Sequence, residues 1–312
     1  MTDVTPDDIL SNSLRAETVS KHRSLRADVW RQFRRHRGAM VGLAILALIV
    51  FGCFVGPIIY GVDPNLTDTA NRSQGVSWKH PLGTDNIGRD VFARVMVGGR
   101  ISLTVGLTAM LVGLAIGTSF GVLSGFFRRL DGWLMRLTDL FLALPTLPLM
   151  LMVLVLFRNR VVDAFGEYWG TFLLVIGIIG ATSWMTTARV VRSQVLAVKQ
   201  KDFVLAAESI GSRRRNIIFR HILPNVLIAV MVAAALGVAA AIITESALSF
   251  LGIGFPIDYP TWGRLLFDAK DFYKLAPARV VGPGVMISLT VISVNLIGDG
   301  LRDALDPKLR SK

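Results

Sequence analysis

Long apolar runs constrain the fold of this chain more than any other feature. Hydrophobic residues make up 52% of its 312 residues and charged residues 18%, and the mean hydropathy is +0.54. The hydrophobic residues collect into charge-free runs of about 17–27 residues, and about 20 apolar helical residues cross a bilayer core of about 30 Å. We therefore expect one all-α integral membrane domain, rather than the two soluble domains that the length alone would indicate.

Six apolar segments follow a polar leader. They are Ala39–Tyr60, Ile101–Phe127, Leu140–Phe157, Thr171–Thr187, Val226–Ile243 and Gly282–Ile297. The leader, residues 1–38, ends in clustered arginines, and residues 27–37 are predicted to form a short helix on the membrane surface. We expect a first transmembrane helix at 39–60 that is an uncleaved anchor, because the leader is too long for a signal peptide. An outer loop at 61–100, a core domain at 101–301 and a tail at 302–312 complete the expected organisation.

The distribution of Lys and Arg predicts the orientation. Of the 34 basic residues, 23 lie in the two terminal tails and in the second and fourth loops, which share one side of the membrane. The other 11 lie in the loops on the opposite side. Since cytoplasmic loops carry the excess of Lys and Arg, both termini and the loop 188–224 are expected in the cytoplasm.

Helix-packing and helix-bending residues recur inside the runs. Gly113, Gly117, Gly121 and Gly125 are four residues apart and lie on one helix face, where small residues let a second helix approach closely. We interpret them as a packing face of the bundle, with a moving contact during transport as the alternative. Pro145 and Pro148 are each expected to bend the third segment.

Composition and motifs exclude several classes of function. The net charge of +12 does not indicate nucleic-acid binding, because the basic residues flank apolar runs instead of lining a soluble face. Carboxylates near mid-membrane, which ion-driven carriers need, are scarce, and Glu245 is interpreted as structural. The sequence contains no phosphate-binding G-x-x-x-x-G-K-[ST] motif, no His/Cys metal set and no nucleophile–base pair. We therefore expect a transporter whose energy comes from other chains. The alternative classes are an ion-driven carrier or channel and a membrane-embedded enzyme.

The loop 188–224 carries the functional prediction. Its sequence from Lys199 is KQKDFVLAAESIGSRRRNIIFRHILPN, which predicts a short helix over 205–210 that Gly211 ends, with Ser212 as the cap of the next helix. Leu223 and Pro224 are expected at the start of the next membrane helix. Many charges outside the lipid between two long runs indicate that a soluble partner docks there.

These residues resemble the coupling loop of permease subunits in bacterial ABC importers, known as the EAA loop. The matching pattern consists of Ala206, Ala207, Gly211, His221, Leu223 and Pro224. Leu205 stands where the family has its leading glutamate, and Glu208 follows three residues later.

Two further stretches narrow the resemblance. Residues 80–92, HPLGTDNIGRDVF, and residues 245–254, ESALSFLGIG, followed by PTWG at 260–263, are similar to the C-type permeases of dipeptide, oligopeptide and nickel importers. The resemblance implies a type I (MetI-like) permease fold with six transmembrane helices in the bacterial inner membrane, and it covers about residues 27–307.

The resemblance also implies the partners. They are a second homologous permease subunit, two ATPase subunits that bind ATP and Mg, an extracytoplasmic substrate-binding protein and membrane lipid, with no cofactor in this chain. The transported solute is expected to be a dipeptide or oligopeptide, with nickel chelates, opines and oligosaccharides as alternatives.

The outward stretches have a structural interpretation of their own. Gly83 and Gly88, among Asp and Asn residues, predict turns, because the order of the acidic residues is not that of a calcium loop. Residues 248–281 predict a folded outer loop with Trp262 at the membrane interface.

Overall fold

The computed structural model describes residues 25–305, and the rest of both expected tails lies outside the described residues. The elements, in chain order, are α2 (Leu25–Arg35), α3 (Arg37–Phe54), α4 (Gly56–Tyr60), η1 (Thr69–Asn71), α5 (Val91–Phe126), α6 (Arg128–Ala143), α7 (Thr146–Phe165), α8 (Glu167–Lys199), α9 (Asp202–Ser209), α10 (Arg214–Asn216), η2 (Ile217–Ile222), α11 (Leu223–Phe250), α12 (Trp262–Ala269), η3 (Lys270–Phe272) and α13 (Ala278–Leu305). Within the described part the only β interaction is an isolated antiparallel bridge, so the fold is all-helical, as predicted.

Among the described residues, five helices are long and apolar enough to cross a membrane, and a broken pair provides a sixth candidate span. The five are α3, α5, α8, the continuous stretch from α10 to α11, and α13. The pair is α6 and α7, which meet at an angle of 87°. The break falls at Pro145, as expected, but Pro148 does not bend α7, because it lies in the first turn, where no helical hydrogen bond needs its missing N–H.

Several helices extend beyond their apolar runs. α5 begins ten residues before the run at Ile101, because the Asp90 carboxylate caps it by accepting from the Ala93 N–H at 2.7 Å. α8 continues to Lys199, through the first third of the expected loop 188–224. Hydropathy reports where lipid ends, whereas a helix ends where its hydrogen bonding or capping changes.

The closest packing in the bundle joins α5 to α8. The four glycines expected to share a face all point at α8, and a Cβ at Gly117 would lie 2.6 Å from the Trp184 carbonyl oxygen. Gly113 meets Ser183, and Gly125 meets Val195, so that contacts advance in the same direction on both helices. The two helices therefore run parallel, with their backbones close together.

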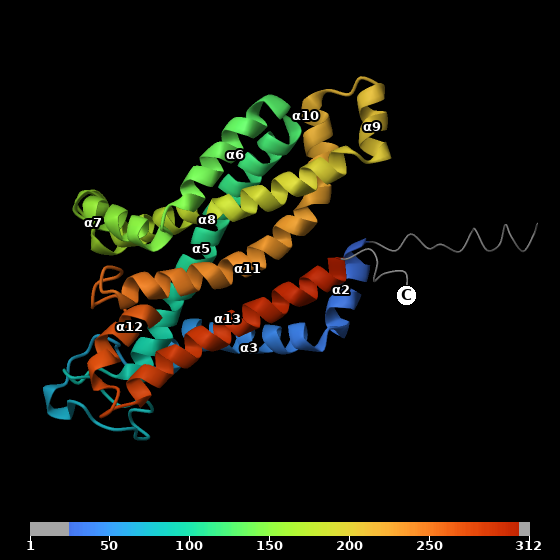
Figure 1. Cartoon of the computed structure of the whole chain (residues 1–312). Helices are drawn as coiled ribbons and strands as arrows, with labels where there is room; N and C mark the ends of the chain where they lie inside the picture. Colours follow the sequence, from blue (N-terminus) through green and yellow to red (C-terminus); the bar gives the residue numbers. More distant parts are fainter. Residues whose placement is uncertain (1–24, 306–312) are drawn as a thin grey trace, which may run out of the picture.

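The remaining spans form a layer beside this pair. In Figure 1, α13 lies between α3 and α11, and α11 in turn contacts α5 and α8. The short helix expected before the first span is α2, which packs Phe33 against Ala39 of α3 and Ala304 of α13. α2, α9 and α10 thus gather at one end of the molecule, whereas α12 and the loop 61–90 lie at the other end (Figure 1).

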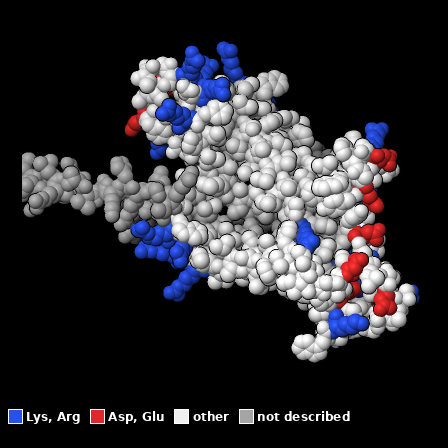
Figure 2. Space-filling model, turned by 180° about the vertical axis from the view of Figure 1, so that it is seen from behind, with Lys and Arg blue, Asp and Glu red and all other residues white. Residues whose placement is uncertain are grey.

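The charges separate along the same axis. Figure 2 shows most of the visible Lys and Arg side chains at the end that carries α2, α9 and α10, and most of the visible Asp and Glu side chains at the opposite end. Between the two ends, this face of the molecule is almost free of charge. An uncharged belt between two charged ends fits a protein whose middle lies in lipid.

A bulky side chain in the α5–α8 contact should separate the two helices. We predict that Gly121→Leu lowers the free energy of unfolding by about 1–3 kcal/mol, because a Cβ there would already lie 2.5 Å from the Val191 Cβ. The matched control is Gly177→Leu on α8, whose Cβ would meet no atom within 4 Å. Thermal unfolding of the detergent-purified protein measures both; equal melting temperatures for the two variants would contradict the packing role.

Candidate functional site

The short helix α9 is built to end sharply. Asp202 lies in its first turn, where a negative charge favours the helix dipole. At the other end, Gly211 adopts a φ of 75°, its N–H donates to the Glu208 carbonyl at 3.0 Å, and the Ser212 N–H donates to the Ala207 carbonyl at 3.1 Å. This is a Schellman arrangement, which explains why glycine occupies position 211. Ser212, expected to cap the next helix, does not do so: Arg213 is the capping residue of α10, and no side chain caps it.

The two faces of α9 differ. Val204 and Ala207 are buried against Ile217, Ile222 and neighbouring residues of the chain itself. The exposed face carries an apolar row of Phe203, Ala206 and Ile210, of which Ile210 is 82% exposed. The two alanines of the motif therefore face different surroundings. Ala207 lies in the chain's own core, and Ala206 faces outward.

Leu205, at the glutamate position of the family, and Glu208, three residues later, are also exposed. Leu205 is 48% exposed, and Glu208 borders a cavity of about 600 Å³ at the start of α6. Arg129, Lys199 and Arg214 line the same cavity, so Glu208 lies in a basic environment. Glu208 is thus placed one turn beyond Leu205, beside cations of three other elements.

The end of the motif lies in a π-helical turn. His221 belongs to η2, and Leu223 and Pro224 open α11 directly after it. Pro224 has no N–H and would collide with the carbonyl four residues earlier in an ideal α-helix, and the wider π turn relieves that collision. The Asn225 side-chain amide donates to the His221 carbonyl at 2.6 Å, across the start of α11.

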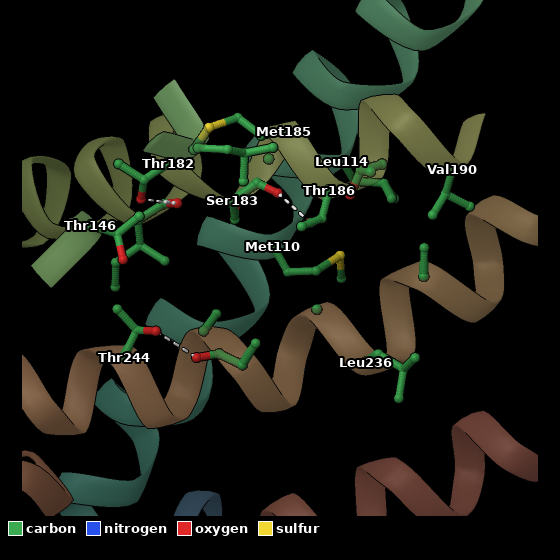
Figure 3. A pocket seen from close by; sticks show the side chains of 18 of the residues that line it. Met110, Leu114, Thr146, Thr182, Ser183, Met185, Thr186, Val190, Leu236 and Thr244 are labelled. Atoms are coloured by element: carbon green, nitrogen blue, oxygen red, sulfur yellow. Dashed lines mark hydrogen bonds between the residues drawn. The ribbon is translucent and has the colours of Figure 1, made fainter. Parts of the chain in front are cut away.

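A second candidate site is a cavity of about 460 Å³ between five elements of the bundle. Figure 3 shows Thr182 and Ser183 of α8 on one side, Leu236 and Thr244 of α11 on the other, and Met110 of α5 between them. Leu142 and Thr146, on either side of the α6–α7 break, complete its wall.

The lining of this cavity is uncharged and weakly polar. None of the residues that line it carries a charge, and its polar groups are hydroxyls. Most of these hydroxyls donate to carbonyls of their own helix, as Thr244 does to Ala240 at 2.8 Å. The wall therefore offers weak, unspecific contacts of methyl, thioether and hydroxyl groups. The recurrence of Thr and Ser at 182, 183, 186 and 187 is the sequence signal that would have indicated it.

At the opposite end, a buried carboxylate joins three helices. Glu245 of α11 is completely buried; its two oxygens accept from Ser102 of α5 at 2.9 Å and from Ser249 at 2.8 Å. The Trp262 backbone N–H of α12 donates to the same Ser102 hydroxyl at 3.2 Å. The structural interpretation of Glu245 fits this geometry.

The prediction that Trp262 lies at the membrane interface is wrong. Trp262 is fully buried instead of interfacial, and its indole N–H donates to the Val95 carbonyl at 3.0 Å. The physical reason is the space at Gly99, where a Cβ would lie 2.7 Å from the indole ring.

Another group on α12, the Asp268 carboxyl, is affected by its surroundings. Burial raises the pKa of Asp268, whereas Arg264, which donates to it at 3.0 Å, lowers that pKa.

The loop before α5 forms the predicted turns. Gly83 and Gly88 have φ values of 75° and 89°, and Asp85 accepts from the backbone N–H of Arg89 at 2.9 Å. The Asp90 carboxylate pairs with His80 at 2.6 Å and accepts from the Tyr60 hydroxyl at 2.9 Å. These contacts of Asp90 therefore hold the loop against α4 and against the start of α5.

Known proteins resemble this chain in sequence. Residues 113–311 match the family model of a binding-protein-dependent transport system inner membrane component, and residues 24–75 match the N-terminal TM domain of oligopeptide transport permease C. Over 302 residues the chain is 37% identical to the oligopeptide transport system permease protein OppC of Bacillus subtilis, with 96% of this chain and 95% of that protein covered.

Two further relatives have different named solutes. The dipeptide transport system permease protein DppC of Alkalihalophilus pseudofirmus is 37% identical over 285 residues, which cover 91% of this chain and 90% of the relative. The glutathione transport system permease protein GsiD of Pectobacterium atrosepticum is 36% identical over 289 residues, which cover 91% of each chain.

The buried carboxylate provides a test of the site's framework. We predict that Glu245→Leu lowers the free energy of unfolding by about 1–3 kcal/mol, because two buried hydroxyls lose their acceptor. Glu208→Leu, at an exposed position, is the control and should leave the melting temperature unchanged. Thermal unfolding of purified protein compares them; a fully stable Glu245→Leu variant would show that the hydroxyls find other partners.

Proposed function

The chain belongs to the family of binding-protein-dependent transport system inner membrane components, and we propose that it is a permease subunit of an ATP-driven importer of dipeptides or oligopeptides. Its relatives are transport permeases, and the chain is accordingly a transporter subunit and not an enzyme. The peptide substrate is carried over from the names of those relatives. The uncharged cavity supports it, since a wall of hydroxyl and methyl groups accepts varied side chains without selecting for charge.

In this proposal α9 is the docking helix for an ATPase subunit. The observation that carries it is the exposed apolar row of Phe203, Ala206 and Ile210, on a short helix that is not itself one of the apolar spans. Exposed apolar surface between basic residues fits a protein partner better than it fits water. The chain has no phosphate-binding loop of its own, so ATP and Mg belong to the two partner ATPase subunits.

The central cavity is proposed as this chain's half of the translocation pathway. It is bounded on its described sides by α5, α6, α7, α8 and α11, and a second, homologous permease subunit would close it. ATP binding would draw the ATPases together, displace α9 and tilt the attached helices, and hydrolysis would reset them.

The orientation follows the charges. We place the end with α2, α9 and α10 in the cytoplasm, since it carries most of the Lys and Arg that Figure 2 shows. The opposite end, with α12 and the loop 61–90, would then meet the substrate-binding protein outside the inner membrane. Its turns are braced by the His80–Asp90 pair, which supports a fixed docking surface.

Charge on the apolar row of α9 should uncouple the transporter. We predict that an Ala206→Asp, Ile210→Asp double variant loses at least about tenfold in uptake per ATP hydrolysed, because two buried carboxylates would oppose docking. Ala206 and Ile210 are more informative positions than Ala207, since Ala207 is only 6% exposed and a charge there would disturb the chain's own core.

The matched control is Ser209→Asp, an exposed position on the same helix but outside the row. Uptake and ATP hydrolysis are measured on the complete transporter in liposomes. Undiminished uptake by the double variant would refute the docking assignment. Cross-linking at Ile210→Cys gives an independent test in which the ATPase should be the captured chain; the native Cys53 is buried and should not compete.

A further inference from the structure

Two ion pairs fasten α6 to α8. Arg192 of α8 contacts both carboxylate oxygens of Asp131, from Nε at 2.5 Å and from Nη2 at 2.7 Å. Arg189, one turn earlier on α8, contacts Asp139 from Nη2 at 2.5 Å. The two aspartates are eight residues apart, so α6 is held at two points about two turns from each other.

Few other interactions hold α6 in place. Thr138 is its only buried residue, and its apolar side chains at 130, 133, 137 and 140 are exposed. At its end Phe141 packs edge-on against Trp184 of α8, with ring centroids 6.3 Å apart. Phe141 and Leu142 also pack against the buried cluster of Trp184, Met185 and Ala188 on α8. The position of α6 relative to α8 therefore depends on the two ion pairs and on the apolar contacts at this end of α6.

The ion pairs lie between the two candidate sites. α8 is one uninterrupted helix that ends at Lys199, two residues before α9. Arg192 is seven residues from that end, which is about 10 Å along the helix. On α6, Asp139 is followed within a few residues by Leu142 and Thr146, which belong to the cavity wall.

We propose that Asp131–Arg192 and Asp139–Arg189 are positioning pairs that carry a displacement of α9 along α8 to α6, and so to the cavity wall at Leu142 and Thr146. This inference rests on the proposed function of α9 as the docking helix. A two-oxygen contact resists rotation as well as separation, which a single contact does not.

The two pairs should contribute unequally. The side chains of Arg192 and Asp131 are 33% and 26% exposed, whereas those of Arg189 and Asp139 are 52% and 61% exposed. Water weakens an exposed ion pair, so the Asp131–Arg192 pair is the main connection and the other pair is the minor one.

Charge reversal tests the inference on the complete transporter in liposomes. Asp131→Arg and Arg192→Asp should each lower uptake per ATP hydrolysed by roughly fivefold, which corresponds to about 1 kcal/mol, while hydrolysis stimulated by the binding protein persists. The combined Asp131→Arg, Arg192→Asp variant restores opposite charges and should recover most of the loss. Arg136→Gln is the control on the same helix, at an exposed arginine for which the described residues provide no carboxylate partner.

Two outcomes would overturn the inference. Uptake per ATP could stay at the wild-type value in both single variants, including the case in which hydrolysis and uptake fall in equal proportion, as for a purely structural pair. The combined variant could also fail to recover while its melting temperature is normal. Failure of the α9 variants to uncouple would instead contradict the proposed function itself, so the two failures are distinguishable.

Discussion

The close contact of α5 with α8 is the constraint on which the rest of the bundle depends. Four glycines on one face of α5 bring its backbone against that of α8, and each contact advances by one helical turn. Glycine in a helix costs about 0.5–1 kcal/mol relative to alanine, so a row of four is retained only where the close approach compensates for it. In lipid the compensation is van der Waals contact, since apolar burial provides no preference between helix and acyl chain.

The contact with α5 makes α8 resistant to bending. A 33-residue helix is about 50 Å long and would bend easily if it stood alone in the bilayer. Packed along α5, it becomes one side of a two-helix unit that reaches from the end of the molecule with α12 to the end with α9. The Glu245–Ser102–Ser249 cluster braces the opposite part of the bundle, where α5, α11 and α12 meet.

Features that depend on short-range sequence patterns were predictable. The glycine spacing predicted a helix-packing face, and four glycines do face one neighbouring helix. Gly211 ended its helix where expected, because a left-handed residue is what a Schellman ending requires. The break at Pro145 also followed from proline chemistry.

Features that depend on tertiary context were not predictable. Trp262 is buried because Gly99, far away in sequence, leaves room for its ring, and no local pattern reports such a pair. The different surroundings of Ala206 and Ala207 depend on where η2 packs. The central cavity arises from five elements together, and its threonines and serines looked like ordinary helix residues in the sequence.

If α9 is the docking helix, α5 and α8 must move together when an ATPase displaces it. Spin labels at Leu107 of α5 and Leu196 of α8, both exposed, would report their separation in the complete transporter with Cys53 replaced by alanine. We expect one unchanged distance distribution in the nucleotide-free and ATP-bound states, while the distance from Leu196 to a label on the facing permease subunit changes. A shift in the Leu107–Leu196 distance on ATP binding would contradict this expectation.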